Sequence, residues 1–325
     1  MTTKKIISKI FSLGELVVDP PVLIDIGASG QLHKKWVLIA KYSICVAFDA
    51  DNREFGFIEK EQSSFKKLFV FNSIVSDEDK SESEFYLTKS PFCSSVLHPD
   101  IKNLSNYSYS DLFQVVDKTY LKTISLSSVI KQLNIRQIDW FKSDSQGLDL
   151  RLFKCLPDEV RKKVIAAEFE PGLIDAYINE DKLFSILQYF EKKNFWISEF
   201  IVKGAPRVSA KKFKSIYSNE KLRKLLALSM KSSPGWAEIS LLNTFAETDI
   251  MSKREYLLGC VFGIIEHQYG FVFSLSESGF EKFGDPIFNE ISSFSKKKIK
   301  QELLKLKFVP SVIKRIKEIT LNKLS

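Results

Sequence analysis

The chain has 325 residues, of which 44% are apolar and 27% are charged. This composition is typical of a globular protein and excludes a disordered chain, a collagen and a coiled coil. The length suggests about two domains. No run of about 18 uncharged apolar residues occurs, so we expect no transmembrane helix. The N-terminal segment 1–20 has lysines within its apolar run, which predicts a short amphipathic helix and not a signal peptide.

The net charge of +8 is concentrated near the C-terminus. Residues 291–325 contain ten basic and two acidic residues, whereas the other residues balance. The chain has 40 lysines and only 8 arginines, and arginine is the usual residue for bidentate contacts with phosphates and bases. We therefore expect no nucleic-acid partner. The lysine-rich tail favours a peripheral contact with a membrane surface, which needs only point charges.

The cysteines give no sign of a structural cross-link or metal. Cys45, Cys93, Cys155 and Cys260 lie far apart, without a CxxC pair or a spacing typical of zinc ligands. The sequence therefore predicts a reduced, cytoplasmic protein, with the inner face of the membrane as an alternative place for its basic tail.

Strand-like and helix-like segments alternate along the first two thirds of the chain. Apolar runs predict strands, and segments with apolar residues on one face predict helices. This alternation indicates an α/β fold with a doubly wound, Rossmann-like and mostly parallel sheet. The expected strands are 22–26, 44–48, 65–75, 138–142 and 164–169, and the expected helices are 31–42, 126–133, 148–156 and 181–193.

The last third of the chain looks helical. We expect a lysine-rich helix over 209–229, apolar-faced helices over 236–245 and 254–269, and two basic amphipathic helices over 295–308 and 311–323. The resulting division is an N-terminal segment 1–20, an α/β domain 21–210, and a helical C-terminal region 211–325 that ends in the basic tail 291–325.

Polar residues follow the predicted strands one after another. Parallel α/β sheets bind ligands outside the carboxyl ends of their strands. Asp25-Ile-Gly-Ala-Ser-Gly30 follows the first strand, and Asp49 follows the second, 22 residues after Gly27. An acid at that spacing can accept hydrogen bonds from ribose hydroxyls, which indicates a cofactor of the adenosine type. GxGxxG is absent, and an acid before the glycines suits a cationic cofactor, so we expect S-adenosylmethionine and not NAD.

Several stretches then carry a resemblance to a known family. VLIDIGASGQLHKKW and VAFDADNREF resemble the first two motifs of class I S-adenosylmethionine-dependent methyltransferases. The ordered set PFCSSVLHPD (91–100), residues 124–156 and VIAAEFEP (164–171) resembles the FkbM family more narrowly. The resemblance covers roughly residues 20–205. It implies a functional pattern made of Lys142, Asp144, Gly147 and Asp149, followed by the paired acids Glu168 and Glu170.

The sequence departs from this family at three positions. Gln31 stands where a glycine is usual, Ser127 replaces an acid, and the acid after the second strand is Asp49 instead of Glu. The resemblance and the strand ends together give the expected cofactor-binding residues, which are Asp25, Gly27, Ala28, Ser29, Gly30, Asp49, Ala50, Asn72, Ser73 and Asp144.

A hydroxyl acceptor gains from a general base, and several residues are candidates for that role. The expected catalytic residues are His98, Asp144, Glu168 and Glu170, and the expected acceptor-binding residues are Ser94, Ser95, His98 and Glu170. Asp144, Glu168 and Glu170 could instead hold a divalent metal through oxygen ligands. His98 could simply cap a loop. We expect His33, on a lysine-bearing helix, to be solvated.

The sequence therefore predicts an S-adenosylmethionine-dependent O-methyltransferase. The family resemblance implies an acceptor hydroxyl on a sugar, a glycan or a related metabolite. The alternative is a binding or scaffold protein on a methyltransferase fold with a basic interaction tail, and the displaced glycine motivates it. A homodimer stays open. Phe169, Tyr177, Trp196 and Trp236 could stack on an acceptor or simply pack in the core.

Overall fold

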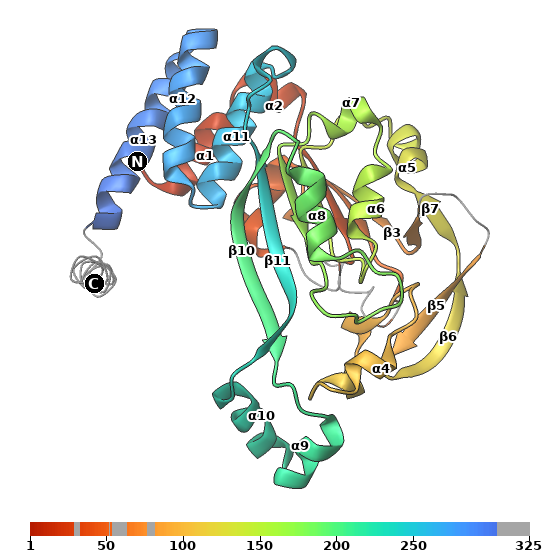
Figure 1. Ribbon diagram of the computed structural model, residues 1–325. Coiled ribbons are helices and arrows are strands. Elements are labelled where there is room, and N and C mark those ends of the chain that lie inside the picture. Colours follow the sequence, from red (N-terminus) through yellow and green to blue (C-terminus); the bar gives the residue numbers. More distant parts are fainter. Residues whose placement is uncertain (29–32, 52, 54–63, 77–81, 304–325) are drawn as a thin grey trace. The chain divides into compact units, whose positions relative to one another are not determined.

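The computed structural model describes residues 1–28, 33–51, 53, 64–76 and 82–303 (Figure 1). The chain divides into two compact units, and the smaller one is discontinuous in sequence. It combines Met1–Leu13 with the segment that begins at Ser252, whereas Gly14–Met251 form the larger unit. Each unit is described below by itself.

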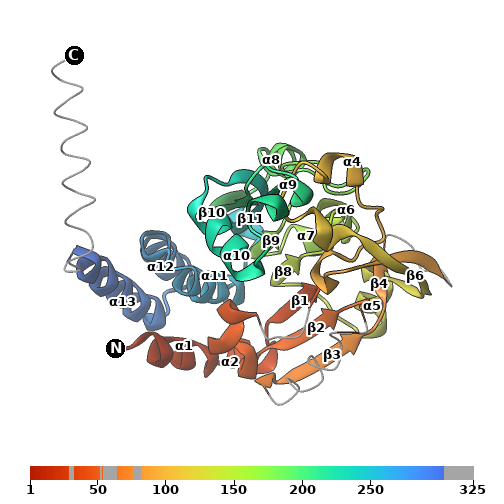
Figure 2. The same ribbon diagram turned by 90° about the horizontal axis from the view of Figure 1, so that it is seen from below.

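The larger unit is built on a seven-stranded sheet in an α/β arrangement. Its order is β3-β2-β1-β8-β9-β11-β10, which can be followed in Figure 2. β11 is antiparallel to both of its neighbours, and all the other pairings are parallel. The strands are β1 (Val22–Ile26), β2 (Ile44–Phe48), β3 (Lys67–Phe71), β8 (Trp140–Ser143), β9 (Ala166–Phe169), β10 (Phe195–Ala205) and β11 (Ser233–Asn243).

The strand order reverses direction between β1 and β8. β1 pairs with β2 on one side and with β8 on the other, both in parallel. Such a switch point leaves a crevice at the carboxyl ends of the two central strands. The short strands β1 and β2 are almost wholly buried, as expected of parallel strands covered on both faces. Both have the bounds that their apolar runs predict.

Short helices and two small ribbons complete the larger unit. β4 pairs in parallel with β7, and β5 pairs with β6 as an antiparallel ribbon. The polar stretch between the third and fourth strands of the large sheet therefore has its own structure. The elements are α2 (Gly14–Val18), α4 (Ile101–Leu104), α5 (Leu126–Gln132), α6 (Asp149–Lys154), α7 (Asp158–Arg161), α8 (Leu183–Phe190), β4 (Ile74–Ser76), β5 (Ser83–Thr88), β6 (Val115–Leu121) and β7 (Thr123–Ser125). Single turns lie at Lys34–Leu38, Ala40–Tyr42, Pro91–Cys93, Ser110–Phe113 and Thr248–Ile250.

The expected helix over 209–229 is two helices. α9 (Ala210–Ile216) and α10 (Glu220–Ser229) lie at the far end of the long β10–β11 pair (Figure 1). Asn219 separates them, because its side chain accepts from the backbone amides of Lys221 and Leu222 and so caps α10. A capping residue of this type starts a new helix.

The smaller unit is a group of helices. α1 (Thr3–Phe11) packs against α11 (Lys253–Ile265) and α13 (Pro286–Leu303), and α12 (Tyr269–Phe283) lies between α11 and α13 in sequence. A capping box of Ser252 and Glu255 starts α11. The predicted helix 295–308 falls partly in α13, and residues 304–325 lie outside the described part of the chain. None of the helices described is both long and apolar enough to cross a bilayer.

The expected helix over 236–245 and the expected boundary at residue 210 are both wrong. The segment is strand β11, which pairs with β9 on one side and with β10 on the other. Short apolar runs do not separate helix from strand by pattern alone, and here the two neighbouring strands decide. The larger unit therefore extends to Met251. Segment 1–20 is likewise divided, since only Met1–Leu13 belong to the helical unit.

The core beneath β8 and β9 contains a cluster of four phenylalanines. Phe153 is 1% exposed, and its ring lies 5.2 Å from that of Phe141, 5.6 Å from Phe169 and 5.4 Å from Phe190. Phe153→Ala should lower the free energy of unfolding by about 3–5 kcal/mol, because it leaves a cavity in a packed core. The measurement is urea denaturation followed by circular dichroism.

The matched control is Phe184→Ala on α8. Phe184 is 69% exposed, so its removal should change the free energy of unfolding by less than about 0.5 kcal/mol. Equal effects of the two substitutions would contradict the placement of Phe153 in the core.

Candidate functional site

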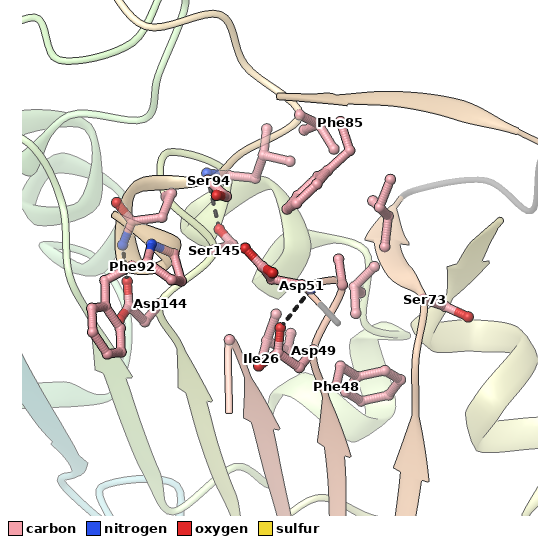
Figure 3. Close-up of a pocket in the computed structure, with 18 residues that line it drawn as sticks. Ile26, Phe48, Asp49, Asp51, Ser73, Phe85, Phe92, Ser94, Asp144 and Ser145 are labelled. Carbon is pink, nitrogen blue, oxygen red and sulfur yellow. Dashed lines mark hydrogen bonds between the residues drawn. The ribbon is translucent and has the colours of Figure 1, made fainter. Parts of the chain in front are cut away.

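A pocket opens at the carboxyl ends of the central strands (Figure 3). Its walls come from the ends of β1, β2 and β8, from the start of β4, from β5 and from the segment 91–96. The lining residues are Ile26, Gly27, Phe48, Asp49, Ala50, Asp51, Ser73, Ile74, Val75, Phe85, Pro91, Phe92, Ser94, Val96, Asp144, Ser145, Gln146 and Leu148. This is the place where doubly wound sheets bind ligands.

Gly27 lines the pocket at a position where no side chain would fit. Its φ is +74°, and an added Cβ would lie 2.2 Å from the carbonyl oxygen of Asp144. The amides of Gly27 and Ala28 both donate to the carbonyl of Phe48, at 2.9 and 3.0 Å. The turn after β1 is therefore tied to β2 and packed against the end of β8. Ser29 and Gly30, also predicted to bind the cofactor, lie outside the described residues.

Two acids follow β2. Asp49 is buried, and its Oδ1 accepts from the backbone amide of Asp51 at 2.8 Å. Arg53 Nε donates to Asp51 at 2.8 Å, and its guanidinium also donates to Ser94 Oγ and to the carbonyl of Thr88, both at 2.9 Å. Burial works to raise the pKa of Asp51, but the hydrogen bonds and charge of Arg53 hold it below its usual value. The places of Asp51 and Arg53 at the pocket were not predicted from the sequence, although an acid two residues after Asp49 was a visible signal.

Asp144 and Glu170 form a hydrogen-bonded carboxyl pair at the ends of β8 and β9. Burial, together with the charge and hydrogen bond of Asp144, raises the pKa of Glu170 to about 9. Burial also raises the pKa of Asp144, against the lowering effect of the Lys142 charge. At neutral pH Glu170 therefore keeps its proton and can donate it to Asp144. Figure 3 shows Asp144 beside Phe92 in the pocket wall.

Neighbouring side chains hold this pair in place. Trp236 Nε1 donates to Glu170 Oε1 at 2.9 Å, and Gln146 Nε2 donates to Asp144 Oδ1 at 2.5 Å. Gln146 has a φ of +56°, a conformation that is rare outside glycine and often found at functional sites. Asp149 fixes both strand ends, because it accepts from Ser143 Oγ at 2.7 Å and from the amide of Glu170 at 3.0 Å.

Glu168 does not join the other two carboxylates. Its Oε1 accepts from Trp140 Nε1 at 2.7 Å and lies 3.1 Å from His33 Nε2, and Lys35 Nζ is 3.1 Å from Oε2. Burial opposes its charge, but the hydrogen bond and charge of His33, followed by the charge of Lys35, lower its pKa to about 2. The structure therefore does not bring Glu168 and Glu170 together, because their hydrogen bonds go to different partners. The expectation that His33 is solvated is wrong.

Asp25 is held by Lys142 and does not line the pocket. Lys142 Nζ lies 2.6 Å from Asp25 Oδ1, and the two residues belong to the neighbouring parallel strands β8 and β1. Burial works against the charge of Lys142, but Asp25 and then Asp144 keep its pKa above the usual range. This ion pair accounts for the burial of Asp25, so the predicted cofactor contact of Asp25 has no support from its position.

The other predicted site residues divide between the pocket and its surroundings. Ala50, Ser73 and Ser94 line it, whereas Ser95 is buried and donates to the carbonyl of Gln146 at 2.9 Å. Asn72 is exposed and donates to the carbonyl of Asp49 at 3.0 Å.

His98 lies apart from the carboxyl pair. It is exposed, its ring packs edge-on against Tyr86, and its Nδ1 is 2.8 Å from the carbonyl oxygen of Pro99. The alternative reading, in which His98 caps a loop, agrees with these contacts.

The aromatic candidates are also separated by the structure. Phe169 belongs to the core, and Tyr177 is buried with its hydroxyl donating to the carbonyl of Cys93 at 2.8 Å. Trp236 is half-buried next to Glu170, and its ring lies 6.1 Å from that of Tyr109, edge to face. Among the residues described, no three His, Cys, Asp or Glu side chains are grouped to hold a metal ion.

The chain was compared with models of protein families, with curated proteins and with solved structures. None of the three comparisons found a match.

The contact of Gly27 with Asp144 predicts a clear effect of substitution. Gly27→Ala should lower the free energy of unfolding by at least about 1–2 kcal/mol, because it adds a left-handed backbone penalty to the clash. Gly14→Ala is the control, since its Cβ would meet nothing within 4 Å, and its effect should stay below about 1 kcal/mol. Chemical denaturation of both variants checks this, and a neutral Gly27→Ala would contradict the geometry.

The raised pKa of Glu170 predicts a dependence of stability on pH. The unfolded chain loses this proton near the ordinary value of 4.5, whereas the native protein keeps it up to about 9. Stability from this group is therefore full below pH 4.5 and falls as the pH rises towards 9. Glu170→Gln should gain stability relative to the unsubstituted protein between pH 6 and 9, on the order of 1 kcal/mol per pH unit. Urea unfolding at several pH values measures the difference.

Glu168→Gln is the matched control for this experiment. The pKa of Glu168 is lowered to about 2, so its stabilising contribution is complete above pH 4.5 and is lost only in acid. Its effect should be destabilising and should not change between pH 8 and 9. A constant effect of Glu170→Gln over the same range would show that Glu170 is ionised in the native protein.

Proposed function

We propose that this protein is an S-adenosylmethionine-dependent O-methyltransferase whose acceptor is a hydroxyl of a sugar, a glycan or a related metabolite. The observation that carries the proposal is the pocket at the switch point between β1 and β8, which is lined by Gly27, Asp49 and Asp144. The doubly wound, mostly parallel sheet is the arrangement that the resemblance to class I methyltransferases implies.

The pocket residues suit an adenosine-type cofactor. Gly27 lines the pocket, and the close approach of its backbone to Asp144 fixes the turn beside which the ligand would lie. Asp49 offers a carboxylate for the ribose hydroxyls. Ile74, Val75 and Phe85 give an apolar wall for a base. When bound, S-adenosylmethionine supplies a methyl group on a cationic sulfur, which favours a pocket containing Asp49, Asp51 and Asp144.

The carboxyl pair suits proton removal from an alcohol. In the proposed reaction Asp144 would take the proton of the acceptor hydroxyl, and S-adenosylmethionine held in the pocket would supply the methyl group and leave as S-adenosylhomocysteine. Glu170 keeps its proton at neutral pH and can donate it to Asp144, so Asp144 is the proposed base. General base assistance of this kind contributes about 10²–10⁴-fold, and positioning of the acceptor supplies the rest.

Aromatic side chains beside the pair suit a ring-shaped acceptor. Phe92 lines the pocket and is 60% exposed. Trp236 donates to Glu170 and packs against Tyr109. An aromatic plane next to a carboxylate can hold the apolar face of a sugar while the acid receives its hydroxyl. This arrangement favours a saccharide over an aliphatic acceptor.

The experiment is calorimetric titration of the full chain with S-adenosylmethionine and, separately, with S-adenosylhomocysteine. Binding is expected for both. Asp49→Asn keeps an acceptor for the Asp51 amide but removes the charge, so it should weaken binding at least about tenfold, as loss of a charge-assisted hydrogen bond does. Asn72→Ala is the control, because Asn72 is exposed and does not line the pocket.

The titration also separates the two readings of the sequence. Binding that Asp49→Asn weakens and Asn72→Ala spares supports the enzyme and directs the search to sugar acceptors. Absence of binding by folded protein would overturn the proposal and favour a non-catalytic binding protein on the same fold.

A further inference from the structure

The segment between β10 and β11 is a strongly basic arm. We use this name for residues 206–232, which include α9 and α10. The basic arm contains eight basic residues and the single acid Glu220, a net charge of +7 in 27 residues. The basic residues are Arg207, Lys211, Lys212, Lys214, Lys221, Arg223, Lys224 and Lys231. This cluster of positive charge is separate from the basic tail 291–325.

The basic arm leaves the sheet on the same side as the pocket. β11 is antiparallel to both β9 and β10, so β10 runs parallel to β9 and ends at the carboxyl edge of the sheet. Lys214 pairs with Asp111 at 2.6 Å, and Arg207 lies over the ring of Tyr107 at 5.8 Å. These contacts attach the arm to the segment that carries Tyr109, whose ring packs against Trp236.

α10 presents leucines to solvent instead of to a core. None of its residues is buried, although helices of globular proteins normally bury an apolar stripe. Leu222 is 46% exposed, Leu225 is 63% exposed and Leu228 is 84% exposed. Spacing of three residues places them along one side of the helix. Ile216, Tyr217 and Met230 add further exposed apolar surface near its ends.

The positive charge and the exposed leucines of α10 together indicate which kind of partner would cover this side of the helix. Lys221 and Lys224 are exposed on the helix that carries the leucines. A helix with leucines on its outer face and lysines beside them fits the boundary between lipid headgroups and acyl chains. A second copy would bring another charge of +7 to the same place. Nucleic acid would leave the leucines in water, and six of the eight basic residues are lysines.

We propose that the basic arm docks on an anionic lipid surface. The exposed leucines of α10 enter the upper part of the bilayer, and the lysines contact lipid phosphates. The inference concerns binding and does not rest on the proposed function. Because the arm leaves the carboxyl edge of the sheet, docking would hold that edge close to the lipid headgroups.

The test is flotation of the full chain with phosphatidylcholine vesicles that contain or lack phosphatidylglycerol. Binding is expected only with the anionic lipid, and it should weaken as salt rises. Leu225→Ser with Leu228→Ser should reduce the partition coefficient at least about tenfold, since the two apolar side chains no longer enter the bilayer. Both positions are exposed, so thermal unfolding should be unchanged.

Two further variants locate the electrostatic contribution. Lys211→Glu with Lys221→Glu should also reduce binding about tenfold or more. Both lysines lie in first helical turns, where an acid is favourable for the helix. Lys296→Glu with Lys297→Glu, an equal charge change on exposed positions of α13, should leave most of the binding intact.

Three outcomes would overturn the proposal. The first is a failure of the unsubstituted protein to float with anionic vesicles. The second is equal flotation of the leucine variant and the unsubstituted protein. The third is a fall in sedimentation coefficient for the leucine variant without vesicles, which would assign the leucines to self-association. None of these results depends on binding of S-adenosylmethionine.

Discussion

The candidate site depends on a close approach between two backbones, at Gly27 and Asp144. The Asp144 amide donates to the carbonyl of Ile26 at 2.9 Å, and the Gly27 amide donates to Phe48. These bonds join the carboxyl ends of β2, β1 and β8, and a side chain at residue 27 would force them apart. The turn after β1, the acid after β2 and the acid after β8 face one pocket because this contact exists. A glycine here has a role in packing as well as in any ligand contact.

Four acids of the sheet, all buried or half-buried, are stabilised in two different ways. Glu168 and Asp25 are paired with cations, since Lys35 Nζ lies 3.1 Å from Glu168 Oε2 and Lys142 Nζ lies 2.6 Å from Asp25 Oδ1. Asp144 and Glu170 have no such full compensation and share a proton instead. A buried carboxyl that titrates far from its ordinary value is typical of functional sites. The contrast between the two arrangements separates structural acids from candidate catalytic ones within a few residues of sequence.

The sequence predicted the elements whose environment is simple and missed those that depend on distant partners. Residues 22–26 and 44–48 form the expected strands because parallel strands buried on both faces are continuous apolar runs. Residues 236–245 were assigned to a helix, since nothing local shows that β9 and β10 lie on either side. Asp144 and Glu170 were predicted from strand ends and from a family resemblance, and the structure places their carboxyl groups side by side. The contact of Glu168 with His33 and the hydrogen bond from Arg53 to Ser94 join residues that are far apart in the sequence. No local pattern therefore predicts them.

The discontinuous smaller unit has a consequence for how the protein is made. α1 buries Ile6, Ile7, Ile10 and Phe11 in a unit whose other helices begin at Lys253. At a translation rate of about 5–20 residues per second, roughly ten seconds or more pass before those helices leave the ribosome. During that interval the larger unit can fold, while the apolar side of α1 has no native partner. The apolar side of α1 is therefore covered late, once the helices that follow Ser252 are available.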